Sequence, residues 1–141
     1  MFAQELREEK IICLSGDLGT GKTTFTQGFL KGLKIKGPYT SPTFLIMKRY
    51  CITHNVKRVA QNVKHKTLCA PRSTFHDIYH IDAYRIKEKG LLNLGWKEIT
   101  ADKKNVIIIE WAERVKKIIP KNSVWIKFKW IDENKREIKF F

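Results

Sequence analysis

One stretch of the sequence, Gly16-Asp17-Leu18-Gly19-Thr20-Gly21-Lys22-Thr23, fits the pattern G-x-x-x-x-G-K-[ST]. Its glycines allow backbone conformations that are closed to other residues, so that successive N–H groups can point inward at phosphate oxygens. We expect Lys22 to reach the β- and γ-phosphates of a nucleotide, and the hydroxyl of Thr23, or of Thr24 beside it, to bind Mg²⁺. Every residue of this stretch, together with Thr24, is therefore a candidate nucleotide-binding residue.

The segments on either side of this stretch supply the structural context that such a loop needs. Lys10–Ser15 is short and apolar and predicts a buried strand. Lys22–Leu33 carries apolar residues at helical spacing and predicts an amphipathic helix, whose positive N-terminal end favours phosphate; Gly37-Pro38 ends it. A strand that runs through a glycine-rich turn into a helix predicts that the chain binds a nucleoside triphosphate.

Further along the chain, apolar patterns of strand type alternate with helical ones. The expected strands are Thr43–Ile52, Phe75–Ile81, Asn105–Glu110 and an alternating hairpin of Val124–Trp130 with Arg136–Phe140, and the expected helical regions end near Glu98 and cover Trp111–Ile119. This order predicts an α/β fold, with a mostly parallel sheet of P-loop type flanked by helices and with antiparallel C-terminal strands. Residues 1–141 are expected to form one domain, in which residues 53–74 are a basic insertion or an extended hairpin loop.

Two acidic residues follow predicted strands. Glu110 ends the branched run Val-Ile-Ile-Ile and is a candidate Mg²⁺ ligand, although an acid at this position also caps a following helix well. Asp82 follows Phe75–Ile81 and is a candidate for orienting or deprotonating an attacking water; an N-cap of the next helix explains it equally well. His80 is interpreted as a packed or hydrogen-bonded core histidine.

Composition narrows the class of protein. The 141 residues have a formal net charge of +14 and are 43% hydrophobic, which excludes a disordered chain. The sequence has no run of about 20 apolar residues for a membrane-spanning helix, its N-terminus has no secretion signal, and its three cysteines suit a reducing cytoplasm. Eleven Lys and Arg but no acid lie between Asp17 and Asp77, which favours RNA or an acidic protein as partner, unless the lysines simply cover the surface.

Four separated motifs occur in the order and rough spacing of one family: G-D-L-G-T-G-K-T-T at 16–24, S-P-T-F at 41–44, Y-H-I-D-A-Y-R at 79–85 and I-E-W at 109–111. Together they make the chain resemble, from about Lys10 to Lys139, the TsaE (YjeE) family of small bacterial P-loop ATPases. The resemblance implies an Mg²⁺-dependent ATPase that is weak alone and is stimulated by TsaB and TsaD. It also implies a role in the threonylcarbamoylation of adenosine 37 in tRNAs that read codons beginning with A.

The resemblance implies cofactors, partners and residue roles as well. ATP and Mg²⁺ are the expected cofactors, and TsaD and TsaB homologues are the expected protein partners, with tRNA contacted indirectly or through the basic residues 48–72. Lys22 and Thr23 would contact phosphate and Mg²⁺, and Thr43 would sense the γ-phosphate. Asp82 would position water, so that Asp82 and Lys22 are the catalytic candidates, and Glu110 would join Thr23 as a metal ligand.

Three further residues are carried over from the family. Trp111 would flank the site, and Glu113 is an additional candidate on the nucleotide side. Arg136 matches the arginine of a Gly-Arg pair near the family's C-terminus and would touch the nucleotide, although the preceding residue here is Lys135. Family members usually have a further strand and helix before the first strand, where this sequence has nine residues. Either the given sequence is truncated before this element, or this member of the family has lost it. In the second case we expect ATP to bind less tightly.

The basic insertion also carries four metal-ligand residue types, Cys51-x-x-His54 and His65-x-x-x-Cys69. Two thiols and two imidazoles can bind a tetrahedral Zn²⁺, but the Lys and Arg residues between them repel a cation. A solvated basic loop is the simpler interpretation.

Two other functions stay open at this point. A small nucleoside or nucleotide kinase would transfer phosphate to a hydroxyl, but Arg85 and Arg114 are isolated, whereas such kinases usually carry an arginine-rich lid. A non-enzymatic nucleotide-binding RNA adaptor would bind tRNA through the insertion.

Overall fold

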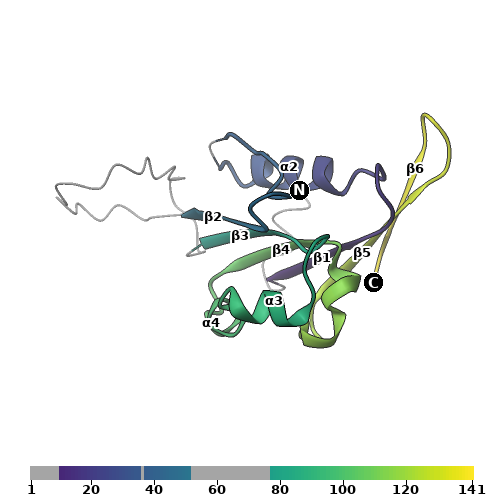
Figure 1. Ribbon diagram of the computed structural model, residues 1–141. Helices are drawn as coiled ribbons and strands as arrows, with labels where there is room; N and C mark the ends of the chain where they lie inside the picture. Colours follow the sequence, from purple (N-terminus) through teal and green to yellow (C-terminus); the bar gives the residue numbers. More distant parts are fainter. Residues whose placement is uncertain (1–9, 36, 52–76) are drawn as a thin grey trace.

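The computed structural model describes residues 10–35, 37–51 and 77–141. Within them lies a six-stranded sheet with the strand order β2-β3-β4-β1-β5-β6 (Figure 1). The strands are β1 (Ile11–Ser15), β2 (Met47–Cys51), β3 (Asp77–Asp82), β4 (Val106–Glu110), β5 (Val124–Trp130) and β6 (Arg136–Phe140). The helical elements are α2 (Lys22–Gly32), α3 (Glu88–Asn93), α4 (Trp96–Ala101) and the 3₁₀ segment η1 (Ala112–Ile118).

The four central strands β3, β4, β1 and β5 are mutually parallel, and an antiparallel strand closes each edge. The predicted fold class, with its antiparallel C-terminal pair, is confirmed. The antiparallel pairing of β2 with β3 at the other edge was not part of that prediction. It sets Cys51 directly opposite Asp77. The predicted insertion 53–74 lies outside the described residues.

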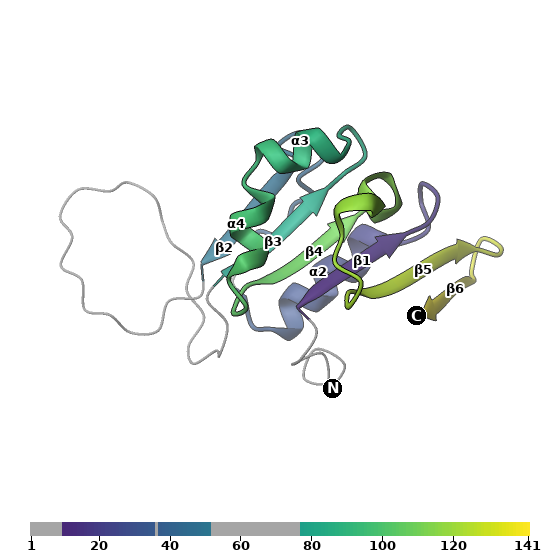
Figure 2. The same ribbon diagram turned by 90° about the horizontal axis from the view of Figure 1, so that it is seen from below.

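Helices cover both faces of the sheet. Helix α2 packs on one face against alternate strand residues, including Ile12, Ile78 and Ile108. On the opposite face α3, α4 and η1 pack on the intervening residues, including Cys13, Ile107 and Ile109 (Figures 1 and 2). Strand β4 is buried along its whole length, as its unbroken Val-Ile-Ile-Ile run predicts for a strand covered on both faces.

The α2 face of the sheet changes from apolar to polar along the strand direction. Because side chains alternate along a strand, Ile78, His80 and Asp82 of β3 share this face, as do Ile108 and Glu110 of β4. In the register of the two strands, Asp82 lies opposite Glu110. The carboxyl ends of the parallel strands therefore present polar side chains beside the first turn of α2.

One expected strand begins later than predicted. Residues 43–46 form a turn, and β2 starts only at Met47. The carbonyl of Pro42 accepts hydrogen bonds from the N–H groups of both Leu45 (2.8 Å) and Ile46 (2.6 Å), and Ile46 has a φ of 65°. The β-prone composition of this segment is outweighed by this tight turn, which holds Thr43 next to the end of β3.

Candidate nucleotide-binding site

The loop between β1 and α2 has the conformation that its glycines permit. Gly16 has a φ of 133°, and a Cβ atom at this residue would lie only 2.2 Å from the carbonyl oxygen of Phe128 in β5. Gly21, with a φ of 101°, precedes α2, and its carbonyl accepts the N–H of Phe25 (2.9 Å). At residue 16 only glycine allows both the positive φ and the close approach to Phe128. The loop can therefore pack directly against β5.

Lys22 folds back over this loop. Its ammonium donates hydrogen bonds to the carbonyls of Gly16 (2.6 Å) and Asp17 (2.7 Å) and lies 3.9 Å from the centre of the Trp111 ring. The residue is only 5% exposed. Burial lowers the pKa of the ammonium below its ordinary value of 10.5, and nearby carboxylates, of which Glu113 acts most strongly and Glu110 next, oppose this shift.

The two predicted metal ligands contact each other directly. The Thr23 hydroxyl donates to Oε2 of Glu110 at 2.6 Å. Glu110 is 2% exposed, at the end of β4, and Thr23 is in the first turn of α2. A hydroxyl and a carboxylate are oxygen ligands of the kind Mg²⁺ prefers, and in nucleotide sites this ion uses few protein ligands because phosphate and water oxygens complete its shell. The residues present therefore fit a Mg²⁺ ion that binds together with a nucleotide.

Asp82 is held by a chain of hydroxyl groups. Ser41 and Thr43 are hydrogen-bonded to each other (2.7 Å), and Thr43 donates to Oδ2 of Asp82 (2.7 Å). Oδ1 of Asp82 accepts the backbone N–H of Tyr84 (2.9 Å). No helix begins at Ala83: Tyr84 and Arg85 form a turn, and the next helix, α3, begins at Glu88 with Lys87 as its N-cap. The predicted helix-capping role of Asp82 is therefore wrong; its carboxylate holds this turn and also lines the cleft described below.

His80 is buried and hydrogen-bonded, as predicted, but the sequence reasoning did not predict that its partner is the candidate metal ligand Glu110. Its Nε2 lies 2.7 Å from Oε1 of Glu110, and the ring is 1% exposed. The available signal was the spacing His-x-Asp at the end of a strand, which places both side chains on one face. Tyr84 is the other residue that was missed, with its ring 5.0 Å from that of Trp111.

These side chains surround one cleft of about 330 Å³. Its lining contains ten of the predicted site residues together with Tyr84: Leu18, Gly19, Gly21, Lys22, Thr23, Thr24, Thr43, Asp82, Glu110 and Trp111. They come from the loop before α2, from α2 itself, from the 43–46 turn and from the ends of β3 and β4. A cleft at the carboxyl ends of parallel strands is where open α/β sheets bind ligands.

The remaining predicted residues lie outside this cleft. Gly16, Asp17 and Glu113 line an adjoining cavity of about 810 Å³ beside β5. Thr20 and Arg136 line another of about 480 Å³ on the β6 side of the loop, to which Gly19, Gly21 and Thr24 also contribute. The Arg136 guanidinium donates to the carbonyl of Asp132 (2.6 Å) and lies 5.7 Å from the Trp130 ring. The structure thus brings Arg136 to the loop but not to Lys22.

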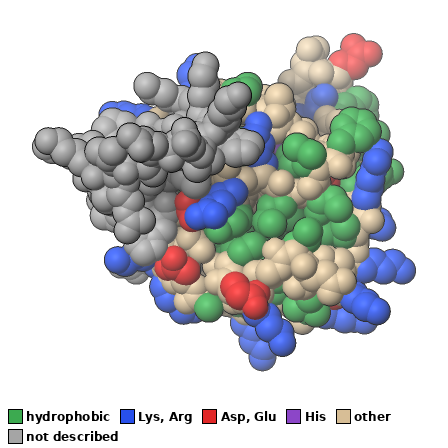
Figure 3. Space-filling model, turned by 60° about the vertical axis from the view of Figure 1, so that its left-hand side comes forward, with side chains coloured by type: hydrophobic (Ala, Val, Ile, Leu, Met, Phe, Trp, Pro, Cys, Tyr) green, Lys and Arg blue, Asp and Glu red, His purple; other side chains and the backbone are tan. Residues whose placement is uncertain are grey.

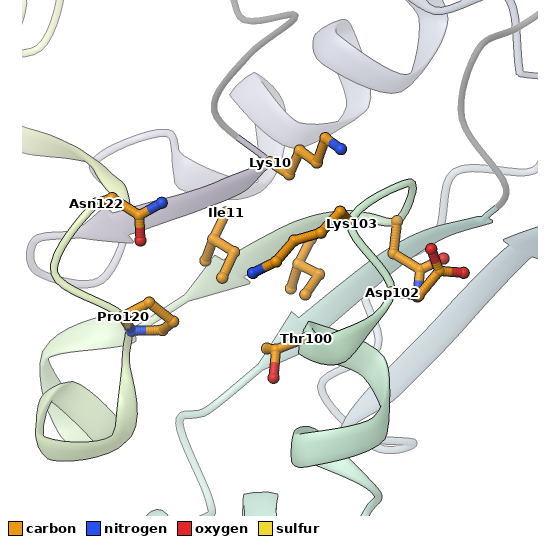
Figure 4. A pocket seen from close by; sticks show the side chains of 9 residues that line it. Lys10, Ile11, Thr100, Asp102, Lys103, Pro120 and Asn122 are labelled. Atoms are coloured by element: carbon orange, nitrogen blue, oxygen red, sulfur yellow. The ribbon is translucent and has the colours of Figure 1, made fainter.

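A further cavity, of about 290 Å³, opens at the other end of the strands, where the parallel strands begin (Figure 4). Lys10 and Ile11 from the start of β1, Thr100 of α4, and Pro120 and Asn122 before β5 line it, and the Lys103 side chain extends across it toward Ile11. It is lined by the amino ends of the parallel strands and contains none of the predicted site residues. The predicted site residues therefore gather in the cleft around Lys22 and not in this cavity.

Three observations concern the molecule outside the cleft: its surface charges, membrane-spanning helices and further metal sites. Figure 3 shows lysine and arginine side chains dispersed around one face, with hydrophobic side chains between them. In the part of the chain that the structure describes, no helix has the length and apolar character needed to cross a membrane. The same residues contain no group of three or more His, Cys, Asp or Glu side chains suited to a metal ion. Of the four residues that could bind zinc but were interpreted as part of a solvated loop, His54, His65 and Cys69 fall outside those residues.

Comparisons with known proteins agree on one family. The family model described as threonylcarbamoyl adenosine biosynthesis protein TsaE matches residues 1–138. A tRNA threonylcarbamoyladenosine biosynthesis protein TsaE from Bacillus subtilis is 32% identical over 130 residues, which cover 92% of this chain and 68% of the relative. Its counterpart from Rickettsia typhi is 33% identical over 138 residues, covering 96% and 80%. The crystal structure of Bacillus subtilis YdiB is similar with a TM-score of 0.57 and 28% identity, covering 94% of this chain and 68% of that one.

Proposed function

The chain belongs to the TsaE family of threonylcarbamoyl adenosine biosynthesis proteins, and from this premise we propose that it binds ATP in the cleft around Lys22 and hydrolyses it with Mg²⁺. The family assigns the chain to the biosynthesis of threonylcarbamoyladenosine in tRNA. The observation that carries the proposal is the convergence of Lys22, Thr23, Asp82 and Glu110 on one cleft.

Each of these residues has a chemical task in the proposed reaction. The loop N–H groups and the Lys22 ammonium would bind the phosphates, with Lys22 exchanging its present carbonyl partners for phosphate oxygens. Thr23 and Glu110 would hold Mg²⁺, which supplies charge neutralisation on the phosphate oxygens when bound. Asp82 would accept a hydrogen bond from the attacking water and orient it toward the γ-phosphorus.

The neighbouring residues support these tasks. The Ser41–Thr43 pair fixes the Asp82 carboxylate, so Thr43 is suited to sense whether a γ-phosphate is present. Trp111 covers Lys22 and shields its ammonium from water. We also propose that homologues of TsaB and TsaD are the protein partners and that they stimulate a weak intrinsic turnover. The motif likeness and the family's place in tRNA modification support this step.

The test is ATP hydrolysis with Mg²⁺ and with EDTA, by the chain alone and with purified TsaB and TsaD homologues. We expect Lys22→Ala to lose nucleotide binding, and Asp82→Asn to bind nucleotide but to hydrolyse it about 10²–10⁴ times more slowly. Lys103→Ala is the matched control. Lys103 lines the cavity at the amino ends of the parallel strands, so this variant should behave as wild type.

Each alternative result has its own meaning. Full hydrolysis by Asp82→Asn would remove Asp82 from the mechanism. ATP binding without any effect of the two partners would refute the proposed partnership. Transfer of phosphate to a small hydroxyl compound in place of water would establish a kinase.

A further inference from the structure

We propose that His80 is a positioning residue that fixes the carboxylate of Glu110 for metal binding. The inference rests on the proposed function, because it gives Glu110 a Mg²⁺ ion to bind. It starts from the two ends of one carboxylate: Oε2 of Glu110 faces the Thr23 hydroxyl at 2.6 Å, and Oε1 faces Nε2 of His80 at 2.7 Å. Each oxygen thus has a different partner on a different element.

The fold explains why His80 reaches Glu110. His80 lies opposite Ile108 in the register of β3 and β4, and Glu110 is two residues further along β4 on the same face. The contact of 2.7 Å between Nε2 and Oε1 spans this diagonal. The ring and the carboxylate are 1% and 2% exposed, so water does not compete for this contact. A buried carboxylate whose one oxygen is held in this way has a fixed orientation.

The direction of the hydrogen bond follows from the acceptor. An ionised carboxylate only accepts, so Nε2 of His80 carries the hydrogen in this contact. The other ring nitrogen, Nδ1, is buried and has no hydrogen-bond partner among the described residues. Among the described residues, the Glu110 carboxylate is thus the only polar group that is hydrogen-bonded to the ring. Because this contact fixes Oε1 of Glu110, it also keeps Oε2 directed toward Thr23.

This arrangement assigns His80 a task that a packed core residue does not have. Groups that orient a metal-binding side chain change metal affinity or activity by about 10- to 100-fold when they are removed. In the described hydrogen bonds His80 does not contact Asp82, the cleft's other acid, and it does not line the cleft. Its effect on the nucleotide must therefore pass through Glu110.

A pair of amide variants isolates this role. The amide of His80→Gln can take the place of Nε2 and donate to Glu110, whereas the amide of His80→Asn is one methylene shorter and falls short of it. A fluorescent ADP analogue is titrated at increasing Mg²⁺ and separately in EDTA, and thermal unfolding checks that both variants are folded. We expect His80→Asn to raise the Mg²⁺ concentration for half-maximal tightening about 10- to 100-fold, with unchanged affinity in EDTA. His80→Gln should stay within a few-fold of wild type.

Two further measurements complete the test. In a Glu110→Gln background, His80→Asn should have no additional effect on the Mg²⁺ response, because the carboxylate it orients is gone. A long-range ¹H–¹⁵N spectrum of the imidazole should show the hydrogen on Nε2 without any nucleotide.

Three results would overturn the inference. An unchanged Mg²⁺ response in a folded His80→Asn variant refutes the positioning role of His80 and leaves the proposed function intact. An equal loss of nucleotide affinity in EDTA also refutes it, because that loss indicates a general structural role. A wild-type chain whose nucleotide affinity ignores Mg²⁺ refutes the metal role of Glu110, and the inference with it. The wild-type titration therefore separates failure of the proposed function from failure of the inference.

Discussion

Lys22 is the residue in which burial and charge oppose each other most directly. Its ammonium is withdrawn from water beneath the Trp111 ring, and this desolvation lowers its pKa. The carboxylates of Glu113 and Glu110 act in the opposite direction but do not cancel the shift. A free lysine would stay charged to well above pH 9, so Lys22 loses its proton at a lower pH than an ordinary lysine.

We predict from this shift that nucleotide affinity declines at alkaline pH. The neutral amine cannot pair with phosphate, and nucleotide phosphates are fully ionised before pH 8, so Lys22 is the group that changes. Above the lowered pKa, binding must take up a proton, and log affinity should fall by up to about one unit per pH unit. The measurement is the dissociation constant of a fluorescent ATP analogue between pH 7 and 10. Lys22→Arg stays charged and should lack the decline; an identical decline in this variant would contradict the prediction.

Single residues could be predicted from the sequence where their role follows from neighbouring residues in the chain, and not where it depends on contacts between separate elements. The P-loop pattern identified Lys22 and Thr23 because its function follows from adjacent residues, and the strand ends identified Asp82 and Glu110. The structure places these residues in one cleft. His80 was correctly predicted to be a buried or hydrogen-bonded residue, but its contact with Glu110 was not predicted, because it depends on the register between β3 and β4, which the sequence pattern does not fix. Tyr84 was missed because no motif residue type marked its packing against Trp111.

At the scale of elements, the phosphate loop depends on how closely it approaches β5. Gly16→Ala would place a methyl group 2.2 Å from the Phe128 carbonyl oxygen at a φ of 133°. We predict a loss of about 3 kcal/mol or more in the free energy of unfolding, from overpacking and backbone strain together. Urea denaturation measures this. An unfolding free energy within about 0.5 kcal/mol of wild type would show that the loop can move away from β5.

Gly28→Ala is the matched control, because Gly28 lies inside α2 with nothing within 4 Å of its added methyl group. Alanine is favoured over glycine in a helix interior, so this variant should be about 0.5–1 kcal/mol more stable than wild type. The two substitutions add the same atoms, and the opposite signs separate the effect of close approach from the effect of alanine itself.

The elements themselves followed the sequence wherever one pattern dominated. The apolar run of β4 and the alternation of β5 with β6 are long enough to determine their structure, and both were predicted. The start of β2 was misplaced because a hydrogen-bonded turn at Pro42 outweighs the β-propensity of Thr43–Ile46. Trp111–Ile119 was expected as a helix and is 3₁₀ over Ala112–Ile118, with a non-helical φ of −124° at Val115.

At the scale of the whole molecule, the candidate site residues gather at the carboxyl ends of the parallel strands. The carboxyl ends of β1, β3 and β4 and the first turn of α2 meet in the cleft of about 330 Å³. The predicted site residues all lie outside residues 52–76, a part of the sequence that contains five Lys and Arg and no acid. The basic segment and the candidate nucleotide site can therefore be changed separately.

The last prediction uses this separation. Cys51 and Asp77 lie opposite each other in the β2–β3 pair, so residues 52–76 can be replaced by a two-residue Asn-Gly turn without changing the register. We expect this shortened chain to keep its fold and its affinity for the ATP analogue, because the described cleft residues are unchanged. Its net charge falls from +14 to +9.

The same variant decides how tRNA is contacted. If residues 48–72 bind tRNA directly, the shortened chain loses affinity for it, and the slope of log K against log salt flattens by up to about 4. A full-length control with glutamine at Lys57, Arg58, Lys64, Lys66 and Arg72 should reproduce this loss if charge is the cause. tRNA binding that survives both changes would mean that tRNA is contacted elsewhere on the chain or only through the partner proteins. tRNA binding that is lost in both but survives Lys22→Ala would show that the basic segment binds RNA independently of the nucleotide site.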